Sequence, residues 1–244
     1  MINASRLAAF IGLHPYVSKK EVFDNMLKKP EKPVPIPEKV EMMMTIPSAN
    51  SNELRGIIKE AQDVVKSDPV LTISQKREVC QHVESTLTKN YGITNEDKVL
   101  NNFERFVNSN KEEEEDEIQI QKDEKIYYRK INNKYTLNGK IDSWEIHPDG
   151  TRIIIETKNR KYKLFRTLKE YEKIQVHAYL YLLPTIKCAK LVERFDEEMD
   201  YITIERDDDY WDTFILPKIV LSCNEFEEYS KSQPLVSDLH LDRK

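Results

Sequence analysis

The chain has 244 residues, of which 39% are hydrophobic and 33% are charged, with a formal net charge of −5 and a mean hydropathy of −0.66. This composition excludes a wholly disordered chain and is typical of a folded protein with a strongly hydrated surface. The low glycine count of 5 excludes a collagen-like repeat, and no apolar run reaches the roughly 20 residues of a membrane helix. The N-terminus has no signal-peptide pattern, so we expect an intracellular protein without a membrane partner.

Helical patterns dominate the first 110 residues. Helices are predicted over 5–11, with Ser5 as a candidate cap, and over 18–27, where Ser18 and Glu21 form a capping-box pattern. Residues 28–52 carry five prolines and are predicted to be a loop or an extended linker. Helices follow over 52–66 and 74–90, and a further one after Gly92. The six consecutive acids of 112–117 are predicted to be a solvated loop.

From residue 117 the hydrophobic period changes to two, which indicates strands. We predict strands over 118–121, 126–131, 134–142, 144–147 and 151–158, with Pro148-Asp149-Gly150 as a hairpin turn. Residues 153–155 are apolar enough for a central strand that is covered on both faces. A helix over 168–183, strands over 189–195 and 201–205, and a helix over 208–229 complete the pattern. The predicted fold class is α/β or mixed α+β, in one domain over 1–244 with a helical N-terminal section.

Charge is segregated along the chain. Residues 158–173 hold seven basic and two acidic residues, a net charge of +5, whereas residues 193–212 carry a net charge of −8. A basic block of this kind suits a phosphate-rich polymer. The three cysteines Cys80, Cys188 and Cys223 lie far apart, so we predict structural thiols and neither a disulfide framework nor a zinc or iron–sulfur cluster.

Two carboxylates and an ammonium are expected to converge at one edge of the sheet. Asp142 is predicted to end one strand and Glu156 the next, and a strand–turn–strand return of this length brings them side by side. Lys158 shares the face of Glu156 because the two are separated by two positions in a strand. Oxygen ligands of this kind suit Mg²⁺ or Mn²⁺, and the lysine could position or deprotonate a water for attack on a phosphodiester. The same cluster could equally be a surface salt bridge, since Glu-x-Lys alone carries no information.

The order of these motifs resembles the PD-(D/E)XK nuclease superfamily, and within it the branch of lambda exonuclease, YqaJ-type viral recombinases and RecB nucleases. The resemblance rests on Gly139-x-x-Asp142, Glu156-x-Lys158 and the helix segment Gln175-Val176-His177-Ala178-Tyr179. Weaker pieces lie at 3–16 and 21–23, at 92–97, and at 201–211. Ile141 stands where the family's name motif has proline, and a long helical insertion separates Met26 from Gly92.

The resemblance implies a restriction-endonuclease-like mixed sheet flanked by helices, and it implies a role for each matching residue. Asp142, Glu156, the Thr157 carbonyl and Glu96 would hold the metal, Lys158 would orient the attacking water, and Gln175 would brace the site. The implied DNA contacts are Ser5, Arg6, Lys140 and Tyr179, to which the basic block adds Arg160, Lys161 and Lys163. Alternatives remain: Glu96 as first-turn charge on a helix, Gln175 and Tyr179 as an ordinary helix face, and Ser5 as a plain cap.

The function implied by the resemblance is a Mg²⁺-dependent deoxyribonuclease, with Mn²⁺ as a substitute. It would degrade duplex DNA from its ends, 5′ to 3′, in viral or phage-type recombination and repair, in the cytoplasm of a host or bacterium or in a nucleus. A structure- or site-specific endonuclease and a non-cleaving DNA-binding protein are the alternatives. A homo-oligomer and a partner that anneals single strands or serves recombination are further implications.

Overall fold

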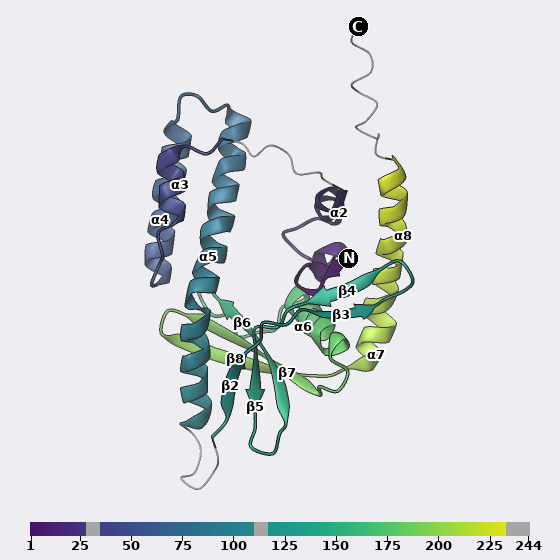
Figure 1. Ribbon diagram of the computed structural model, residues 1–244. Coiled ribbons are helices and arrows are strands. Elements are labelled where there is room, and N and C mark those ends of the chain that lie inside the picture. The colour runs from purple at the N-terminus through teal and green to yellow at the C-terminus, as the bar shows by residue number, and fades with distance from the viewer. Residues whose placement is uncertain (28–34, 110–116, 233–244) are drawn as a thin grey trace.

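The computed structural model describes residues 1–27, 35–109 and 117–232 (Figure 1). The fold is mixed α/β, as predicted, with a three-stranded sheet in the order β1-β4-β3 and a five-stranded sheet in the order β2-β5-β6-β7-β8. The start of the proline-rich stretch (28–34) and most of the acidic run (112–116) lie outside the described residues, so those two predictions stay untested.

The N-terminal segment forms a short strand and two helical turns. Strand β1 (Ile2–Asn3) pairs in parallel with β4, and η1 (Ala4–Arg6) and α1 (Leu7–Phe10) follow. Asn3 caps η1, because its Oδ1 accepts hydrogen bonds from both the backbone N and the Oγ of Ser5. The prediction of Ser5 as the cap is therefore wrong. Helix α2 (Lys19–Leu27) begins as predicted, with the Glu21 N–H donating to Ser18 Oγ over 3.1 Å.

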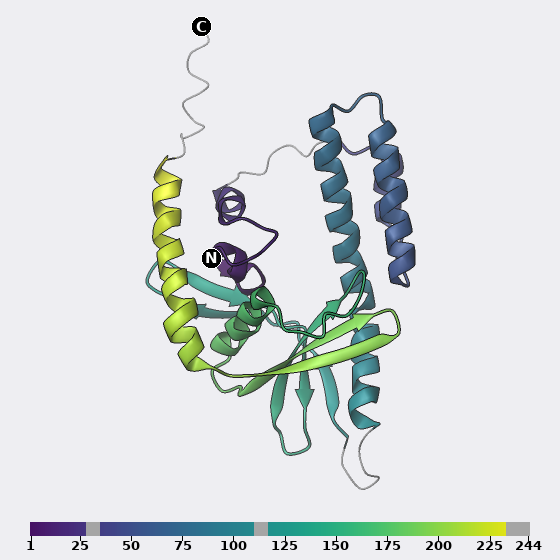
Figure 2. The ribbon, with the colours of Figure 1, turned by 180° about the vertical axis from the view of Figure 1, so that it is seen from behind.

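Three helices form an arm that extends from the sheet (Figures 1 and 2). They are α3 (Glu38–Met44), α4 (Ser51–Ser67) and α5 (Ile73–Asn108). Helix α3 lies inside the stretch predicted as a loop, and it forms because Val40 and Met43 are buried against α4 and α5. The arm has its own apolar core, made of Val40, Met43, Leu54, Ile58, Ala61, Val65, Val79, Val83, Leu87 and Tyr91.

Helix α5 runs without a break through Gly92, where the sequence predicts a new helix. Tyr91 and Asn95 are buried on either side of the glycine, so packing holds this turn in the helix. A single internal glycine costs about 1 kcal/mol relative to alanine, which this packing outweighs. The N-terminal half of α5 belongs to the arm, and its C-terminal half covers one face of the sheet (Figure 1).

The five-stranded sheet contains β2 (Gln119–Lys122), β5 (Ser143–Ile146), β6 (Arg152–Asn159), β7 (Cys188–Phe195) and β8 (Glu198–Glu205). Strand β6 is central, as predicted. Ile154 packs in the core that contains α6 (Glu170–Leu182), and Ile155 points the other way, against α5. The β5–β6 turn includes Gly150 at φ +84°, which only glycine adopts readily.

The predicted strand over 134–142 is interrupted. Strand β4 (Thr136–Gly139) pairs with β3 (Tyr127–Lys130) in the smaller sheet, and the chain then crosses to β5. The C-terminal helix begins at Asp208 as predicted, and consists of α7 (Asp208–Tyr210), the π-helical turn η2 (Trp211–Ile215) and α8 (Leu216–Ser232). Across the described ranges, no helix has both the length and the apolar character needed to cross a membrane.

Candidate metal and phosphodiester site

Asp142 lies opposite Glu156 across the β5–β6 hairpin. It precedes β5 rather than ending the previous strand, yet the antiparallel register that pairs Ser143 with Ile155 sets Asp142 against Glu156. Asp142 Oδ2 accepts hydrogen bonds from the backbone N–H of Thr157 over 2.7 Å and from its Oγ1 over 2.8 Å. These two bonds fix the carboxylate at the edge of β6. No other described residue donates to the second oxygen, Oδ1, which is therefore free to bind a ligand.

Glu156, Lys158 and Gln175 form one hydrogen-bonded cluster. Glu156 and Lys158 point to the face of β6 that α6 covers, and Lys158 Nζ donates to Glu156 Oε1 over 2.6 Å. Gln175, on α6, donates from Nε2 to the same oxygen over 2.7 Å and accepts from Lys158 Nζ at Oε1 over 3.1 Å. Gln175 therefore contacts both charged side chains of the cluster, and its bracing role in a catalytic site stays a prediction.

One oxygen of Glu156 has no partner. The side chain is 4% exposed, and its Oε2 is buried without a hydrogen bond. Burial and the neighbouring Asp142 carboxylate raise the pKa of Glu156 to about 7, although Lys158 and the Tyr179 hydroxyl counteract them. A buried carboxylate oxygen without a donor is costly, and it is also the ligand that a hard divalent cation requires.

Lys158 is held as an ammonium. Burial acts to lower its pKa, but the carboxylates of Glu156 and Asp142 outweigh burial, and the net shift is upward. Such a lysine suits hydrogen-bond donation and charge stabilisation and is a poor base near neutral pH. A raised pKa favours the ammonium form, which can position a water, over the neutral amine that deprotonating a water requires.

Glu96 faces the site from the opposite side of the sheet. It lies in the interior of α5, 23 positions after Ile73, so the alternative of first-turn helix charge is wrong. Burial and the Asp142 carboxylate raise the pKa of Glu96, while Lys122 Nζ, 3.3 Å from its Oε1, acts in the opposite sense. Asp142 thus stands in electrostatic contact with Glu156 on one side and Glu96 on the other.

Tyr179 supports the cluster from the core. It is 3% exposed, and its hydroxyl accepts a hydrogen bond from Gln175 Nε2 over 2.8 Å. Its ring also lies against Gly139, where an added Cβ would come within 2.9 Å of both Tyr179 Cε1 and Ala4 Cβ. The position of Gly139 therefore has a steric reason, and the buried Tyr179 is not available for the DNA contact that the resemblance implies.

The basic block is largely neutralised in three dimensions. Arg160, predicted to contact DNA, is only 9% exposed, and its guanidinium binds Glu172 on α6 and Glu193 on β7. The other oxygen of Glu193 accepts from the backbone N–H groups of Phe165 and Arg166, so this carboxylate anchors the loop after β6. Arg160 is a structural residue, and its assignment as a DNA contact is corrected. The sequence analysis does not single out Glu193, because its partners Arg160, Phe165 and Arg166 lie about 30 positions away in the chain.

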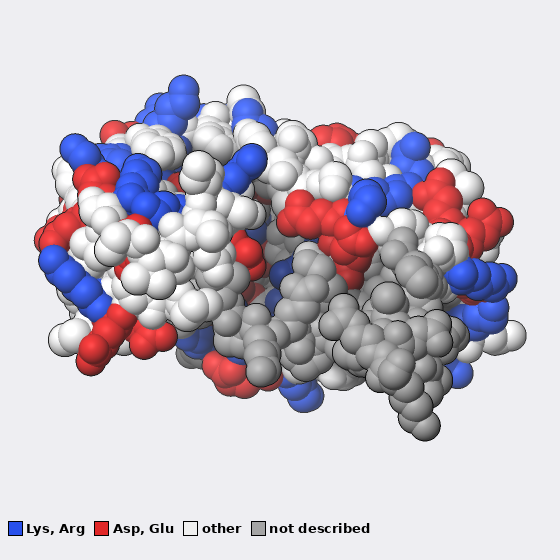
Figure 3. All heavy atoms as spheres, turned by 90° about the horizontal axis from the view of Figure 1, so that it is seen from above, with Lys and Arg blue, Asp and Glu red and all other residues white. Residues whose placement is uncertain are grey.

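The remaining predicted DNA contacts differ in whether they have an acidic partner. Lys161 pairs with Glu84 over 2.6 Å and Lys140 with Glu124 over 2.6 Å, whereas Ser5, Arg6 and Lys163 are exposed. In the view from above, basic and acidic side chains are interspersed (Figure 3). In the part of the block that the structure describes, the lysines without an acidic partner are Lys163, Lys169 and Lys173.

The carboxylates of Asp142 and Glu156 are the kind of ligand that a small hard cation prefers, although they are only two. Throughout the described ranges, no three His, Cys, Asp or Glu side chains form a ready metal cluster. The free oxygens are Asp142 Oδ1 and Glu156 Oε2, and a site with two carboxylates plus water is typical of Mg²⁺. Glu96 forms an ion pair with Lys122, and its role as a further metal ligand stays a prediction.

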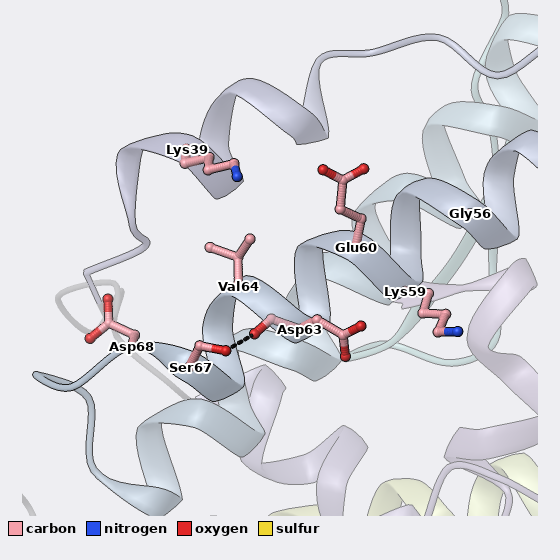
Figure 4. A pocket seen from close by; sticks show the side chains of 8 residues that line it. All are labelled: Lys39, Gly56, Lys59, Glu60, Asp63, Val64, Ser67 and Asp68. Carbon is pink, nitrogen blue, oxygen red and sulfur yellow. Dashed lines mark hydrogen bonds between the residues drawn. The ribbon is translucent and has the colours of Figure 1, made fainter.

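A surface hollow of about 650 Å³ lies away from this site, on the helical arm (Figure 4). Its lining comes from α3, α4 and the residue after α4, and Lys39, Glu60 and Val64 point into it. The hollow contains none of the residues that the sequence singles out, so it is not part of the candidate site.

Comparisons with known proteins leave the function open. No family model matches the chain, and no curated protein matches it. Among solved structures, the protein SSO0001 is similar over 84% of this chain and 83% of its own, with a TM-score of 0.40 and 15% sequence identity. A likeness at this level carries no argument about fold or function.

Proposed function

We propose that the protein is a divalent-metal-dependent DNA nuclease and that it degrades duplex DNA from its ends. The observation that carries the proposal is the buried, unpartnered Oε2 of Glu156 beside Asp142, with Lys158 held as an ammonium two positions away. A pure binding protein gains nothing from two carboxylates that repel each other and raise the pKa of Glu156. DNA and attack from the ends are taken from the family resemblance.

Each residue has a separate task. Asp142 and Glu156 would hold Mg²⁺ or Mn²⁺, and the carbonyl of Thr157, the residue after Glu156, would complete the protein ligands. When bound, the cation would polarise a phosphoryl oxygen and lower the pKa of a water. Lys158 donates two hydrogen bonds within the cluster, to Glu156 and Gln175, so its third N–H is free for a water or a phosphate oxygen.

The net reaction is hydrolysis. The water oxygen forms a bond to phosphorus, and the bond from phosphorus to the leaving sugar oxygen breaks. One water proton ends on that sugar oxygen through solvent, and the other is released from the phosphomonoester product. Lys158 stabilises the charge that develops on the phosphate, and Gln175 keeps the lysine in place.

The test is cleavage of one plasmid in two forms, covalently closed and linearised, with Mg²⁺ or Mn²⁺. We expect nucleotides to be released from the linear form and the Lys158→Ala variant to lose at least about 100-fold in rate. Lys134→Ala is the control, because Lys134 is also ion-paired, with Glu227, but lies in the β3–β4 turn. A wild-type protein that is inert with both metals, or a Lys158→Ala variant as active as wild type, refutes the proposal.

The same assay separates the alternatives. Nicking or linearisation of the closed circle would indicate a structure- or site-specific endonuclease that uses the same residues. Retention of DNA without any cleavage would indicate a binding protein.

A further inference from the structure

A stripe of α6 leads from the core to the surface through the candidate site. Tyr171, Gln175 and Tyr179 are four positions apart, so they share one face of the helix. Tyr179 and Gln175 are buried, and Tyr171 is half-buried at the outer end. Gln175 accepts a hydrogen bond from Lys158 Nζ, so Tyr171 lies one helical turn from the residue that contacts the proposed catalytic ammonium.

The loop between α1 and α2 brings two more rings to Tyr171. The centroid of the His14 ring is 4.9 Å from that of Tyr171, and the Tyr16 ring is 5.9 Å from His14 and 6.5 Å from Tyr171. His14 Nδ1 accepts hydrogen bonds from the backbone N–H groups of Tyr16 and Val17 over 3.2 and 3.1 Å. The imidazole thus fixes the loop that carries Tyr16, so the tyrosine is preorganised.

Tyr16 is nevertheless 82% exposed. A large aromatic side chain on a fixed loop loses little conformational entropy when a flat ligand stacks on it, and exposing it to water has no benefit for folding. The two rings behind it, His14 and Tyr171, complete an aromatic ledge, and Tyr171 continues it to the face of α6 that carries Gln175. We call the three residues the ledge.

We infer that the ledge of Tyr16, His14 and Tyr171 binds a nucleobase of the strand whose phosphate occupies the Asp142–Glu156–Lys158 site. This inference rests on the proposed function and adds a base-stacking contact to it. Every phosphate in a nucleic acid is flanked by bases, and stacking on an aromatic ring is tolerant of sequence. The ledge therefore fits an unpaired nucleotide at the end of a strand, because a base within a duplex has no free face.

The experiment measures binding without cleavage. A fluorescein-labelled, single-stranded oligothymidine of twelve nucleotides is titrated with the full chain in EDTA, and anisotropy reports the dissociation constant. We expect Tyr16→Ala to weaken binding about 5- to 150-fold, since stacking contributes about 1–3 kcal/mol per base. Tyr16→Phe keeps the ring and should bind as wild type does. Tyr128→Ala is the matched control, because Tyr128 is an exposed tyrosine on β3.

A second series identifies the ligand as a base. One abasic nucleotide is placed at each position of the oligonucleotide in turn. At one position near an end, the abasic substitution should weaken wild-type binding as much as Tyr16→Ala does, and it should have no further effect on the Tyr16→Ala variant. Such coupling is the signature of a direct contact.

The outcomes separate this inference from the proposed function. If the protein cleaves DNA but Tyr16→Ala binds oligothymidine as tightly as wild type, the ledge is refuted and the nuclease stands. If Tyr16→Ala weakens binding and every abasic substitution acts equally on both proteins, the loop contributes through the backbone and the base contact is refuted. If Tyr16→Ala weakens binding and couples to one abasic position but wild type cleaves no DNA, the base contact stands and the nuclease does not. A wild type that binds no oligothymidine overturns the ledge directly.

Discussion

Replacing Glu156 by glutamine should stabilise the protein at neutral pH, and the size of the effect follows from its burial. The pKa of Glu156 rises from its ordinary value of 4.5 to about 7, because burial and Asp142 disfavour the charged form. At about 1.4 kcal/mol per pKa unit, the ionised carboxyl costs the folded state about 3 kcal/mol once the pH exceeds 7. Glutamine has the same shape and never ionises, so it avoids this cost.

The sign of the pH dependence follows from linkage. Below pH 4.5 Glu156 is protonated in the folded and the unfolded chain, and the substitution should have little effect. Between pH 4.5 and 7 the unfolded chain releases the proton while the folded protein keeps it, so the stability of wild type falls relative to the variant. The pKa of about 7 already includes the attraction of Lys158, which acts to lower it, so the expected gain at pH 8 stays at about 3 kcal/mol.

Urea unfolding in EDTA, followed by the fluorescence of the buried Trp144 and Trp211, measures this difference at pH 5 and pH 8. Glu145→Gln is the matched control, because Glu145 is equally buried but both of its oxygens accept hydrogen bonds from Lys190 Nζ. Removing one partner of that buried pair should destabilise the protein by about 3 kcal/mol. If Glu156→Gln instead destabilises the protein at pH 8 as Glu145→Gln does, Glu156 is an ordinary buried ion-pair residue and the reasoning is wrong.

Four other substitutions give further predictions about stability. Gly139→Ala should destabilise the protein by about 1–3 kcal/mol, because its Cβ would meet Ala4 and Tyr179. Gly92→Ala in α5, with open space around it, should stabilise the protein by up to about 1 kcal/mol. Chemical denaturation compares the two variants with wild type. Burial lowers the pKa of His177 to about 4, so the unfolded chain takes up a proton on this residue before the folded protein does as the pH falls. The free energy of unfolding of wild type should therefore fall by up to about 3 kcal/mol between pH 7 and pH 4. A His177→Gln variant with an equally steep pH dependence would contradict this. Arg194 is 2% exposed, and its guanidinium nitrogens have no hydrogen-bond partner. Arg194→Met should therefore leave the free energy of unfolding unchanged or raise it by about 1–4 kcal/mol. A lower melting temperature of the variant would show that the charge is needed.

The parts of the fold that sequence predicts well are those that local chemistry decides. The Pro148-Asp149-Gly150 turn sets the β5–β6 register, and that register brings Asp142 opposite Glu156. The spacing of Glu156 and Lys158 likewise follows from the alternation of a strand. These features need only neighbouring residues, so the sequence contains the information.

The missed features depend on residues that are distant in the chain. Helix α5 continues through Gly92 because both sides of that turn are packed, and α3 forms against the arm rather than from its own propensity. Arg160 is buried because Glu172 and Glu193 meet it from α6 and β7. The unpartnered oxygen of Glu156, on which the proposed function rests, is also a property of tertiary packing, since no sequence pattern shows which oxygen lacks a donor.

The most direct test of the account separates metal binding from chemistry. Mn²⁺ is titrated calorimetrically into wild type, Asp142→Asn, Glu156→Gln and Lys158→Ala, and each protein is then assayed for DNA cleavage. Both carboxylate variants should lose Mn²⁺ binding and cleavage together, whereas Lys158→Ala should keep Mn²⁺ binding and lose cleavage. Equal Mn²⁺ binding by all four proteins, or none by wild type, would contradict the claim that Asp142 and Glu156 form a metal site.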